Sequence, residues 1–445
     1  MDLSAAGQQA FEELKASVSI NACHDSQARS TSLGCLPSTR KDQIGTIMNW
    51  IESQASNRKP LFVVLGPAGS GKSCLLWTVA QICKDKGFYA AGFFFSATDP
   101  ERNTSDRLIN TIVYQICEAI PELRPYVARV IETEASILSG SLYARLYSLL
   151  LQPLRQLQSD HPGISFRPRI VIIDAVDACS NENDQTQVIA TLTEALSSGS
   201  FPFLCILSSR FGRHIEGVLS ADPLIHIGVT LGLAGTKEMQ DIRSYVDHEM
   251  KVIRSRHPSV SRIHDKWPSE SDLQTIVKRS GGQFIYAEVV MRYVGSPDHN
   301  PQDRLQDIVA SETGTNAFDA LDDLYRALMF SIKNIESAME ILGPEILRLS
   351  PRFWTPEGLA YHNFVKDHFV KLDADLVLAP LAPVLKYEDH NIKLYHLSFS
   401  EFLLDPARSR EYFVHPTKWQ KWSVSRLVQL FYNEGMSSWY LLAFV

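Results

Sequence analysis

The 445-residue sequence is 45% hydrophobic and 21% charged, with a net charge of −7, which is typical of a globular protein of roughly two to four domains. The acidic balance argues against a nucleic acid or an anionic membrane as the main partner. No apolar run approaches the roughly 20 residues of a membrane span, and the N-terminus shows no secretory signal. Seven irregularly spaced cysteines indicate free thiols in a reducing compartment, most simply the cytoplasm.

The first half of the chain alternates between strand and helix patterns. Residues 1–36 form a polar leader with one amphipathic stretch, Phe11–Val18, and Arg40–Glu52 has helical spacing of its apolar residues. Strands are then expected at Leu61–Leu65, Tyr89–Phe95, Ile170–Asp174, Phe203–Ser208 and Leu224–Val229, and helices at Gly71–Lys84, Ser105–Ile120, Leu142–Leu157 and Gln185–Ser197. Because the strands are continuous apolar runs between helices, the pattern predicts an α/β domain with a doubly wound parallel sheet.

Beyond the fifth expected strand the pattern becomes helical. Apolar spacing predicts helices that begin near Thr236 and that cover Asp272–Arg279 and Phe284–Val294. The polar segment Gly295–Gly314 has the composition of a linker.

A second helical unit follows the expected linker. It ends in a predicted hairpin, Val384–Tyr387 with Ile392–His396, and in a helix at Ser398–Leu404. Helices followed by one late hairpin are the plan of a winged helix.

The strongest motif lies directly after the first strand. Gly66–Ser73 reads Gly-Pro-Ala-Gly-Ser-Gly-Lys-Ser and matches G-x-x-x-x-G-K-[ST], and the strand before it and the helix after it argue against an ordinary glycine-rich turn. Glycines let the backbone curl so that successive N–H groups point at phosphate oxygens, and the helix N-terminus adds partial positive charge. Lys72 would reach the β and γ oxygens, and the Ser73 hydroxyl would join a Mg²⁺ shell. We therefore expect this loop to bind a purine nucleoside triphosphate, ATP or GTP, with Mg²⁺, through Gly66, Pro67, Ala68, Gly69, Ser70, Gly71, Lys72 and Ser73.

Two acidic residues stand at and just after the end of the strand Ile170–Asp174. An acid at the end of a buried strand in such a domain holds Mg²⁺ through its water, so Asp174 is expected to be a metal ligand together with Ser73. The alternative is that Asp174 caps the next helix. Asp177 is a candidate catalytic residue that would orient the attacking water.

The fourth strand ends in Ser208-Ser209-Arg210. An arginine at this place would face the γ-phosphate and report its presence, so Arg210 is a second candidate catalytic residue. The alternative is a solvated loop arginine, because arginine is mostly exposed in proteins.

Several segments together resemble NACHT-type P-loop NTPases of the STAND signal-transduction class, in the nephrocystin-3-like form of fungal NLR-like proteins. Cys35–Arg40, which reads Cys-Leu-Pro-Ser-Thr-Arg, is similar to the family's Cys-x-Pro-Gly-Thr-Arg segment, and Ser208–Arg210 is similar to its Thr-Ser-Arg sensor. Further along, Gly282–Ala287 resembles a Gly-Leu-Phe-Ile-Tyr-Ala helix, Leu321–Tyr325 resembles the opening of the winged helix, and His396–Leu403 resembles its His-x-Ser-Phe-x-x-Phe-Leu segment. The resemblance covers nearly the whole chain.

The resemblance implies three further nucleotide-binding residues and a set of domains. Thr39 and Arg40 would border the nucleotide, and His396 would touch the diphosphate and hold a closed state. The alternative for His396 is a hairpin-edge histidine that packs against the sheet. The implied domains are a leader (1–36), a NACHT P-loop domain (37–232), a small helical domain with a linker (233–315), a winged-helix domain (316–412) and the start of a further helical segment (413–445). Such proteins usually continue into a repeat array, so we expect a truncated or standalone core.

Two positions depart from the family's pattern. Ala178 stands where a Glu is usual, and Ser38 replaces a Gly against which the base is expected to pack. Ala178 bears on hydrolysis more than on binding, because Lys72, Ser73 and Asp174 remain.

Three functions therefore stay open. The first is a signalling switch that hydrolyses ATP or GTP slowly and cycles between closed diphosphate and open triphosphate forms. In that case the open form would assemble into a homo-oligomer and recruit a downstream signalling protein, which the sequence does not identify. The second is a scaffold that binds nucleotide without turnover. The third is a metabolic P-loop kinase, against which the lack of an evident acceptor site in the second half of the sequence argues.

Overall fold

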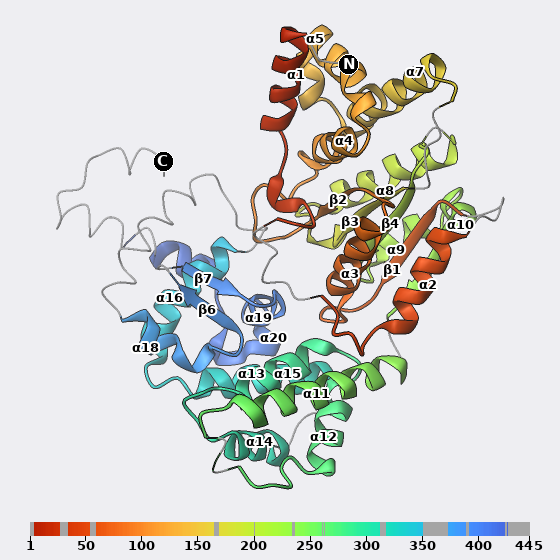
Figure 1. The fold of residues 1–445 in the computed structure, drawn as a ribbon. Helices are drawn as coiled ribbons and strands as arrows, with labels where there is room; N and C mark the ends of the chain where they lie inside the picture. Colours follow the sequence, from red (N-terminus) through yellow and green to blue (C-terminus); the bar gives the residue numbers. More distant parts are fainter. Residues whose placement is uncertain are drawn as a thin grey trace. The chain divides into compact units, whose positions relative to one another are not determined.

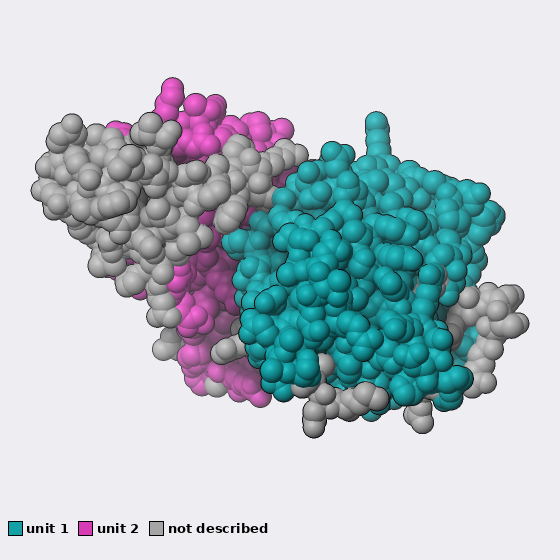
Figure 2. All heavy atoms as spheres, turned by 90° about the horizontal axis from the view of Figure 1, so that it is seen from above, with its two compact units in different colours: residues 1–67, 71–234 teal, residues 68–70, 235–445 magenta. Residues whose placement is uncertain are grey.

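The computed structural model describes residues 4–26, 34–53, 59–163, 169–199, 201–233, 236–259, 261, 263–311, 317–349, 373–388, 391–422 and 425. The chain divides into two compact units, Met1–Pro67 with Gly71–Ala234 and Ala68–Ser70 with Gly235–Val445 (Figure 2). Within the described ranges, no helix has both the length and the apolar character needed to cross a membrane.

A five-stranded parallel sheet forms the centre of the first unit (Figure 1). Its strands are β1 (Leu61–Leu65), β2 (Tyr89–Phe94), β3 (Ile170–Asp174), β4 (Leu204–Ser209) and β5 (Gly228–Gly232), in the order β2-β3-β4-β1-β5. In register, Leu65 pairs with Ser209 and Ile173 pairs with Leu207. The strands β1, β3 and β4 therefore end at the same edge of the sheet, with β4 between the other two.

Helices cover both faces of this sheet, because successive side chains of each strand point to opposite sides. Phe62 and Val64 belong to one core with α2 (Lys41–Glu52) and α3 (Lys72–Asp85). Val63 and Leu65 belong to a larger core on the other face. That core is covered by α4 (Leu108–Ala119), α5 (Arg124–Thr133), α6 (Leu142–Leu146), α7 (Gln152–Asp160) and α8 (Glu182–Ser197). The predicted α/β class with a doubly wound parallel sheet is confirmed.

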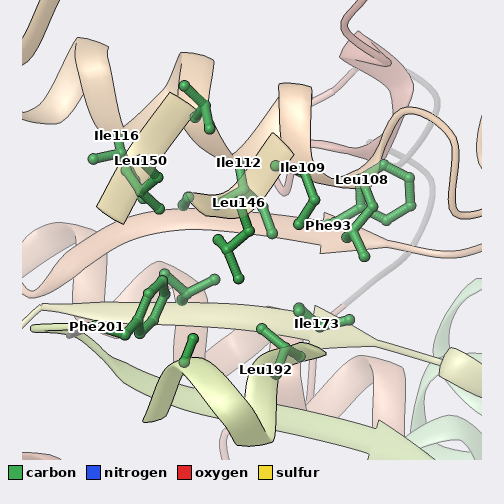
Figure 3. Close-up of a cluster of buried hydrophobic side chains, with 14 of the residues drawn as sticks. Phe93, Leu108, Ile109, Ile112, Ile116, Leu146, Leu150, Ile173, Leu192 and Phe201 are labelled. Atoms are coloured by element: carbon green, nitrogen blue, oxygen red, sulfur yellow. The ribbon is translucent and has the colours of Figure 1, made fainter. Parts of the chain in front are cut away.

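Figure 3 shows part of the larger core. Ile112, Leu146 and Leu192, from three different helices, gather around the sheet residues Phe93 and Ile173. All five side chains are at most 3% exposed. Full burial of one such side chain stabilises a fold by about 1.5–3 kcal/mol, so this layer contributes substantially to the stability of the first unit.

The expected leader contributes a helix to the same core. Helix α1 (Ala5–Ala16) begins after Ser4, whose hydroxyl accepts a hydrogen bond from the N–H of Gly7. It contacts α4 and α5, and Phe11 stacks on Tyr114 with 5.4 Å between ring centroids. Leu14 is fully buried. The amphipathic stretch of the leader is thus a structural part of the first unit.

Four segments of the first unit differ from the expected elements. One helix was expected over Leu142–Leu157. The structure has three consecutive elements there: α6, a π-helical turn over Tyr147–Leu151, and α7. The strand expected at Leu224–Val229 is a short helix, α10 (Leu224–Ile227), followed by β5. Helix α5 was not expected, and α9 (Arg213–Leu219) follows β4. Short apolar runs do not distinguish strand from helix by periodicity alone, which explains the shift at β5.

The second unit is mainly helical and has one continuous hydrophobic core. Its helices are α11 (Thr236–Arg256), α12 (Glu270–Ser280), α13 (Phe284–Val294), α14 (Pro301–Ala310), α15 (Ala317–Phe330), α16 (Ile335–Arg348), α18 (Ala374–Leu378), α19 (Ser398–Leu403) and α20 (Pro406–Ser409). Where a linker was expected, α14 is present: Asn300 caps it, Pro301 occupies its first turn, and Leu305 and Ile308 are buried. Asparagine and proline, read as linker residues, are here the ordinary start of a helix.

The late hairpin is present as predicted. Strands β6 (Leu385–Glu388) and β7 (Asn391–Leu394) are antiparallel, with Leu385 opposite Leu394, and α19 follows directly. Residues 350–372, which belong to the expected winged helix, lie outside the described residues. The winged helix therefore stays a prediction.

Candidate functional site

The P-loop (Gly66–Ser73) connects β1 to α3 at the carboxyl edge of the sheet. Gly69 and Gly71 have φ angles of +71° and +83°, and Gly71 is the N-cap residue of α3. Side chains rarely tolerate this left-handed conformation, whereas glycine adopts it freely. The two glycines therefore produce the curled backbone that the motif predicts.

Lys72 lies in the first turn of α3 and is only 8% exposed. Its Nζ donates to the carbonyl oxygens of Gly66, at 2.7 Å, and of Pro67, at 2.9 Å. Burial lowers the pKa of Lys72 to about 8; the carboxylates of Asp177 and Asp174 raise this pKa, and Arg210 lowers it. The structure thus brings Lys72 within electrostatic reach of all three charged residues that the sequence singled out.

Asp174 ends β3 and is 1% exposed. The hydroxyl of Ser208, on the neighbouring strand β4, lies 2.6 Å from Oδ1 of Asp174 and 2.9 Å from the backbone nitrogen of Ala175. Because that backbone N–H can only donate to the hydroxyl, the Ser208 proton must go to the Asp174 carboxylate. The following 3₁₀ turn is capped by Ala175, not by the Asp174 side chain. The capping alternative for Asp174 is therefore wrong.

Asp177 and Arg210 form a two-point contact. Nε of Arg210 lies 3.0 Å from Oδ2 of Asp177, and the backbone N–H of Arg210 donates to Oδ1 at 2.9 Å. The side chains are 18% and 30% exposed, so Arg210 is a paired residue at the end of β4 rather than a solvated one. A catalytic role for either residue alone would require this contact to open.

The segment ahead of the P-loop adjoins helix α3. The N–H of Cys35 donates to the hydroxyl of Thr78 on that helix. Thr39 and Arg40 are 3% and 1% exposed, and Arg40 has a φ of +60° at the start of α2. Ser38 is exposed. The structure thus buries the two residues expected to border the nucleotide and leaves the substituted position at the surface.

Oxygen donors suitable for Mg²⁺ are available from two residues. Ser73 offers a hydroxyl in the first turn of α3, and Asp174 offers a carboxylate already oriented by Ser208. Mg²⁺ prefers such hard oxygen ligands and completes its shell with water and substrate phosphates. Among the described residues, no three His, Cys, Asp or Glu side chains form a metal-binding group.

Ser208 is a site residue that sequence reasoning did not assign. It is fully buried and fixes both the carboxylate of Asp174 and the backbone after it. Ala175 has a left-handed φ of +57°, and its hydrogen bond to Ser208 holds this uncommon conformation. The sequence does place a serine at the end of an apolar strand. Its bond to Asp174, however, depends on the order of the strands in the sheet.

His396 lies between β7 and α19 in the second unit, apart from the residues above in sequence. Its Nδ1 is 3.0 Å from the backbone nitrogen of Ser398. It borders a pocket, open to solvent, that Arg292, Tyr325 and Tyr395 also line.

Residues 43–210 match the model of a family described as nephrocystin 3, N-terminal. The matched region contains the P-loop, the strand that carries Asp174 and the Ser208–Arg210 segment. The matched region has the α/β fold of a P-loop domain. In it, β4 lies between β1 and β3, which places Ser208 between the phosphate-binding loop and the acidic strand end.

Solved structures with similarity to the chain include Cdc6p from Pyrobaculum aerophilum (TM-score 0.36, 13% identity, covering 92% of this chain and 99% of that one). PCH-2 from C. elegans has a TM-score of 0.32 and 14% identity and covers 67% of this chain and 70% of its own. The replication initiator DnaA, bound to AMPPCP and single-stranded DNA, has a TM-score of 0.32 and 10% identity. The match covers 77% of this chain and 94% of the DnaA chain. Similarity this distant says nothing about what this chain binds. No curated protein matches the chain.

Proposed function

We propose that this protein is a nucleotide-dependent signalling switch that binds ATP or GTP with Mg²⁺ and hydrolyses it slowly. The observation that carries the proposal is the buried Lys72 in a glycine-curled loop, close to the carboxylates of Asp174 and Asp177. An ammonium group beside two carboxylates at a helix N-terminus can hold a phosphate chain and, through Asp174, its cation.

In this proposal each site residue has a defined task. The P-loop cradles the phosphates, Ser73 and Asp174 hold Mg²⁺, and Thr39 and Arg40 border the nucleotide. Bound Mg²⁺ would neutralise charge that develops on the phosphates. Asp177 and Arg210 act as a pair that orients water and responds to the γ-phosphate.

The switching step rests on the difference between diphosphate and triphosphate. We propose that His396 contacts the diphosphate in a closed form and that the triphosphate favours an open form able to form homo-oligomers and recruit a signalling partner. The nucleotide can shift this equilibrium only by the difference in its affinity for the two forms. The proposal is supported by the resemblance of the His396–Leu403 segment to the corresponding segment of STAND proteins.

The central test is direct binding of ATP, ADP, GTP and GDP to the full chain with Mg²⁺, followed by phosphate release from the same samples. Binding with slow release supports the hydrolysing switch. Failure of all four nucleotides to bind would overturn the proposal at its first step. The comparison of adenine with guanine nucleotides also determines the base preference.

A second candidate, a scaffold that binds nucleotide without turnover, is favoured by the surroundings of Ala178. This residue lies half-buried against the larger hydrophobic core of the first unit. It therefore supplies no acid beside Asp177, whose carboxylate already contacts Arg210. Binding without any phosphate release would favour this scaffold.

Introducing an acid at position 178 should increase turnover. We expect Ala178→Glu to raise the rate of phosphate release by about tenfold or more, because a second carboxylate near the attacking water would accept its proton. Ala178→Gln is the matched control, since it adds the same volume without the charge. Equal rates in the two variants would contradict this account of position 178.

Nucleotide affinity should decrease as the pH rises through about 8. Phosphate favours the ammonium form of Lys72, whose pKa in the protein without nucleotide is lowered to about 8 by burial. Below that pH the ammonium is already present, and above it each pH unit should weaken binding by up to about tenfold. Calorimetric Kd values for ADP, measured from neutral pH upward, test this expectation. The control is Lys72→Arg, whose guanidinium stays charged, so its weaker binding should not change over the same range.

A further inference from the structure

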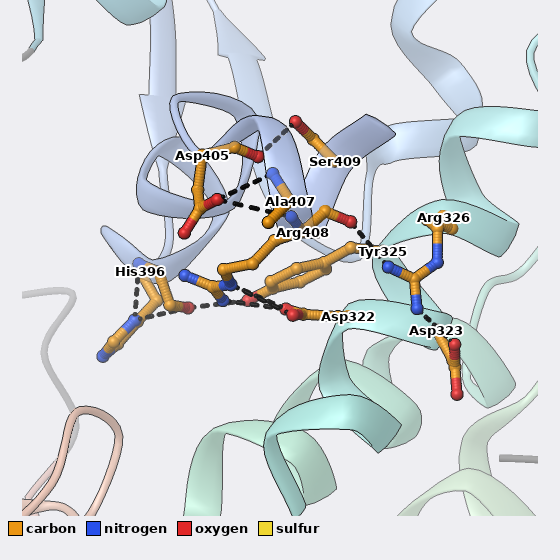
Figure 4. Close-up of polar contacts among 10 residues, drawn as sticks. Asp322, Asp323, Tyr325, Arg326, His396, Asp405, Ala407, Arg408 and Ser409 are labelled. Carbon is orange, nitrogen blue, oxygen red and sulfur yellow. Dashed lines mark hydrogen bonds and ion pairs between the residues drawn. The ribbon is translucent and has the colours of Figure 1, made fainter. Parts of the chain in front are cut away.

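Three hydrogen-bonding side chains form a chain inside the second unit, beside the hairpin β6–β7 (Figure 4). Nδ1 of His396 lies 3.0 Å from the backbone nitrogen of Ser398 and 2.9 Å from its hydroxyl oxygen. The same hydroxyl oxygen lies 2.7 Å from the phenol oxygen of Tyr325 on α15. Ser398 and Tyr325 are 3% and 1% exposed, so water does not compete for these bonds.

The direction of each bond follows from the donors. The backbone N–H of Ser398 can only donate, so Nδ1 of His396 accepts and carries no proton. The Ser398 hydroxyl faces the same nitrogen and therefore donates to it, which leaves its oxygen to accept from Tyr325. Burial raises the pKa of Tyr325, and the phenol thus keeps the proton that it donates.

An ion pair fixes α15 against the segment that follows α19. Arg408 contacts Asp322 at 3.0 Å through Nε and at 2.8 Å through Nη2. Arg326 donates to the carbonyl oxygen of Arg408 at 2.6 Å, and the side chain of Asp405 accepts from the N–H groups of Ala407 and Arg408 (Figure 4). Asp322 is one helical turn before Tyr325, so this ion pair ties the part of α15 that carries Tyr325 to the segment that contains Arg408.

We infer that Ser398 and Tyr325 are positioning residues that hold His396 in the tautomer with its proton on Nε2, the form in which that nitrogen can donate to a phosphate oxygen. The inference rests on the proposed contact between His396 and the diphosphate. A doubly protonated ring would place a proton on Nδ1 against the Ser398 N–H, so this arrangement suits a neutral histidine. Recognition then depends on one directed hydrogen bond and not on the charge of an imidazolium.

The tautomer can be measured without any nucleotide. In the full chain with ¹⁵N-labelled histidine, long-range ring ¹H–¹⁵N correlations at neutral pH should show an unprotonated Nδ1 and a protonated Nε2 for His396. The signals are assigned by their loss in His396→Gln. A proton on Nδ1 would overturn the inference, whatever the nucleotide experiments show.

The positioning role is tested by ADP and ATP affinities of Ser398→Ala and Tyr325→Phe. Each removes one hydroxyl of the chain, so we expect ADP binding to weaken about threefold to tenfold while ATP binding is unchanged. Ser400→Ala is the control for the first, because Ser400 is buried in the same helix and its hydroxyl bonds to Leu397. Tyr412→Phe is the control for Tyr325→Phe. Tyr412 belongs to the same hydrophobic core but is not one of the three hydrogen-bonded residues.

His396→Gln separates the inference from the proposed function. If it leaves ADP affinity unchanged, the contact between His396 and the diphosphate is overturned, and the inferred phosphate recognition falls with it. If it weakens ADP binding while Ser398→Ala and Tyr325→Phe behave like their controls, the contact stands and the positioning role is overturned. Thermal unfolding midpoints equal to those of the controls show that the variants remain folded.

Discussion

Lys72→Ala should abolish measurable nucleotide binding, with an increase in Kd of about 100-fold or more for both ATP and ADP. At the proposed site the ammonium would supply charge-assisted hydrogen bonds to phosphate, each of which contributes about 1.5–3 kcal/mol. The side chain is buried among the loop carbonyls, so the alanine variant also loses the contact that shapes the empty loop. Isothermal titration with each nucleotide and Mg²⁺ measures the effect.

Lys84→Ala is the control for this experiment. Lys84 lies on the same helix α3, is half exposed, and pairs with Asp25 at the surface. Its replacement removes the same charge from the same helix, but away from the P-loop. Unchanged affinity in Lys72→Ala would contradict the assignment of Gly66–Ser73 as the phosphate site, whereas equal losses in both variants would indicate a general effect of charge or folding.

Asp174→Asn should remove the dependence of ATP binding on Mg²⁺ and reduce phosphate release by about 100-fold or more. The asparagine can still accept the hydrogen bond of Ser208, which lies 2.6 Å from Oδ1, so the local structure should persist. The variant loses the negative charge that we propose holds the cation. We expect ATP binding without Mg²⁺ to stay within about threefold of the unmodified protein, because the phosphate cradle does not include Asp174.

Two further variants separate local from general effects of this change. Asp85→Asn removes one carboxylate from the exposed end of α3, where Asp85 accepts a hydrogen bond from Gln81, and should alter nothing. Ser208→Ala leaves the charge but frees the Asp174 carboxylate, so its effect on Mg²⁺ dependence should be intermediate. An Asp174→Asn variant with unaltered Mg²⁺ dependence would show that the metal is held elsewhere.

Features encoded by adjacent residues were predictable from the sequence. The P-loop follows from eight consecutive residues, and the strands that end at Leu65 and Asp174 follow from short apolar runs. The helix and hairpin near His396 were also predicted, because their patterns are local. In each case neighbouring residues contain both the hydrophobic signal and the turn signal that bounds it.

Features that depend on distant pairings were not predictable in the same way. The bond between Ser208 and Asp174 exists because β4 lies next to β3, and strand order is not written in either segment. The ion pair of Asp177 with Arg210 has the same origin. The composition around Asn300 and Pro301 predicted a linker where the structure has a capped helix. Asparagine and proline are common both in loops and at the first positions of helices, so composition alone does not distinguish the two.

The packing of α1 has a practical consequence for anyone who isolates or transplants the NTPase domain. A cut after residue 36, where the sequence changes character, would delete Phe11 and Leu14 from the interior and uncover the apolar sides of α4 and α5. Fragments trimmed there should aggregate, even though every residue proposed to contact the nucleotide is retained. A fragment that keeps this core intact therefore has to include α1 and its capping residue, Ser4.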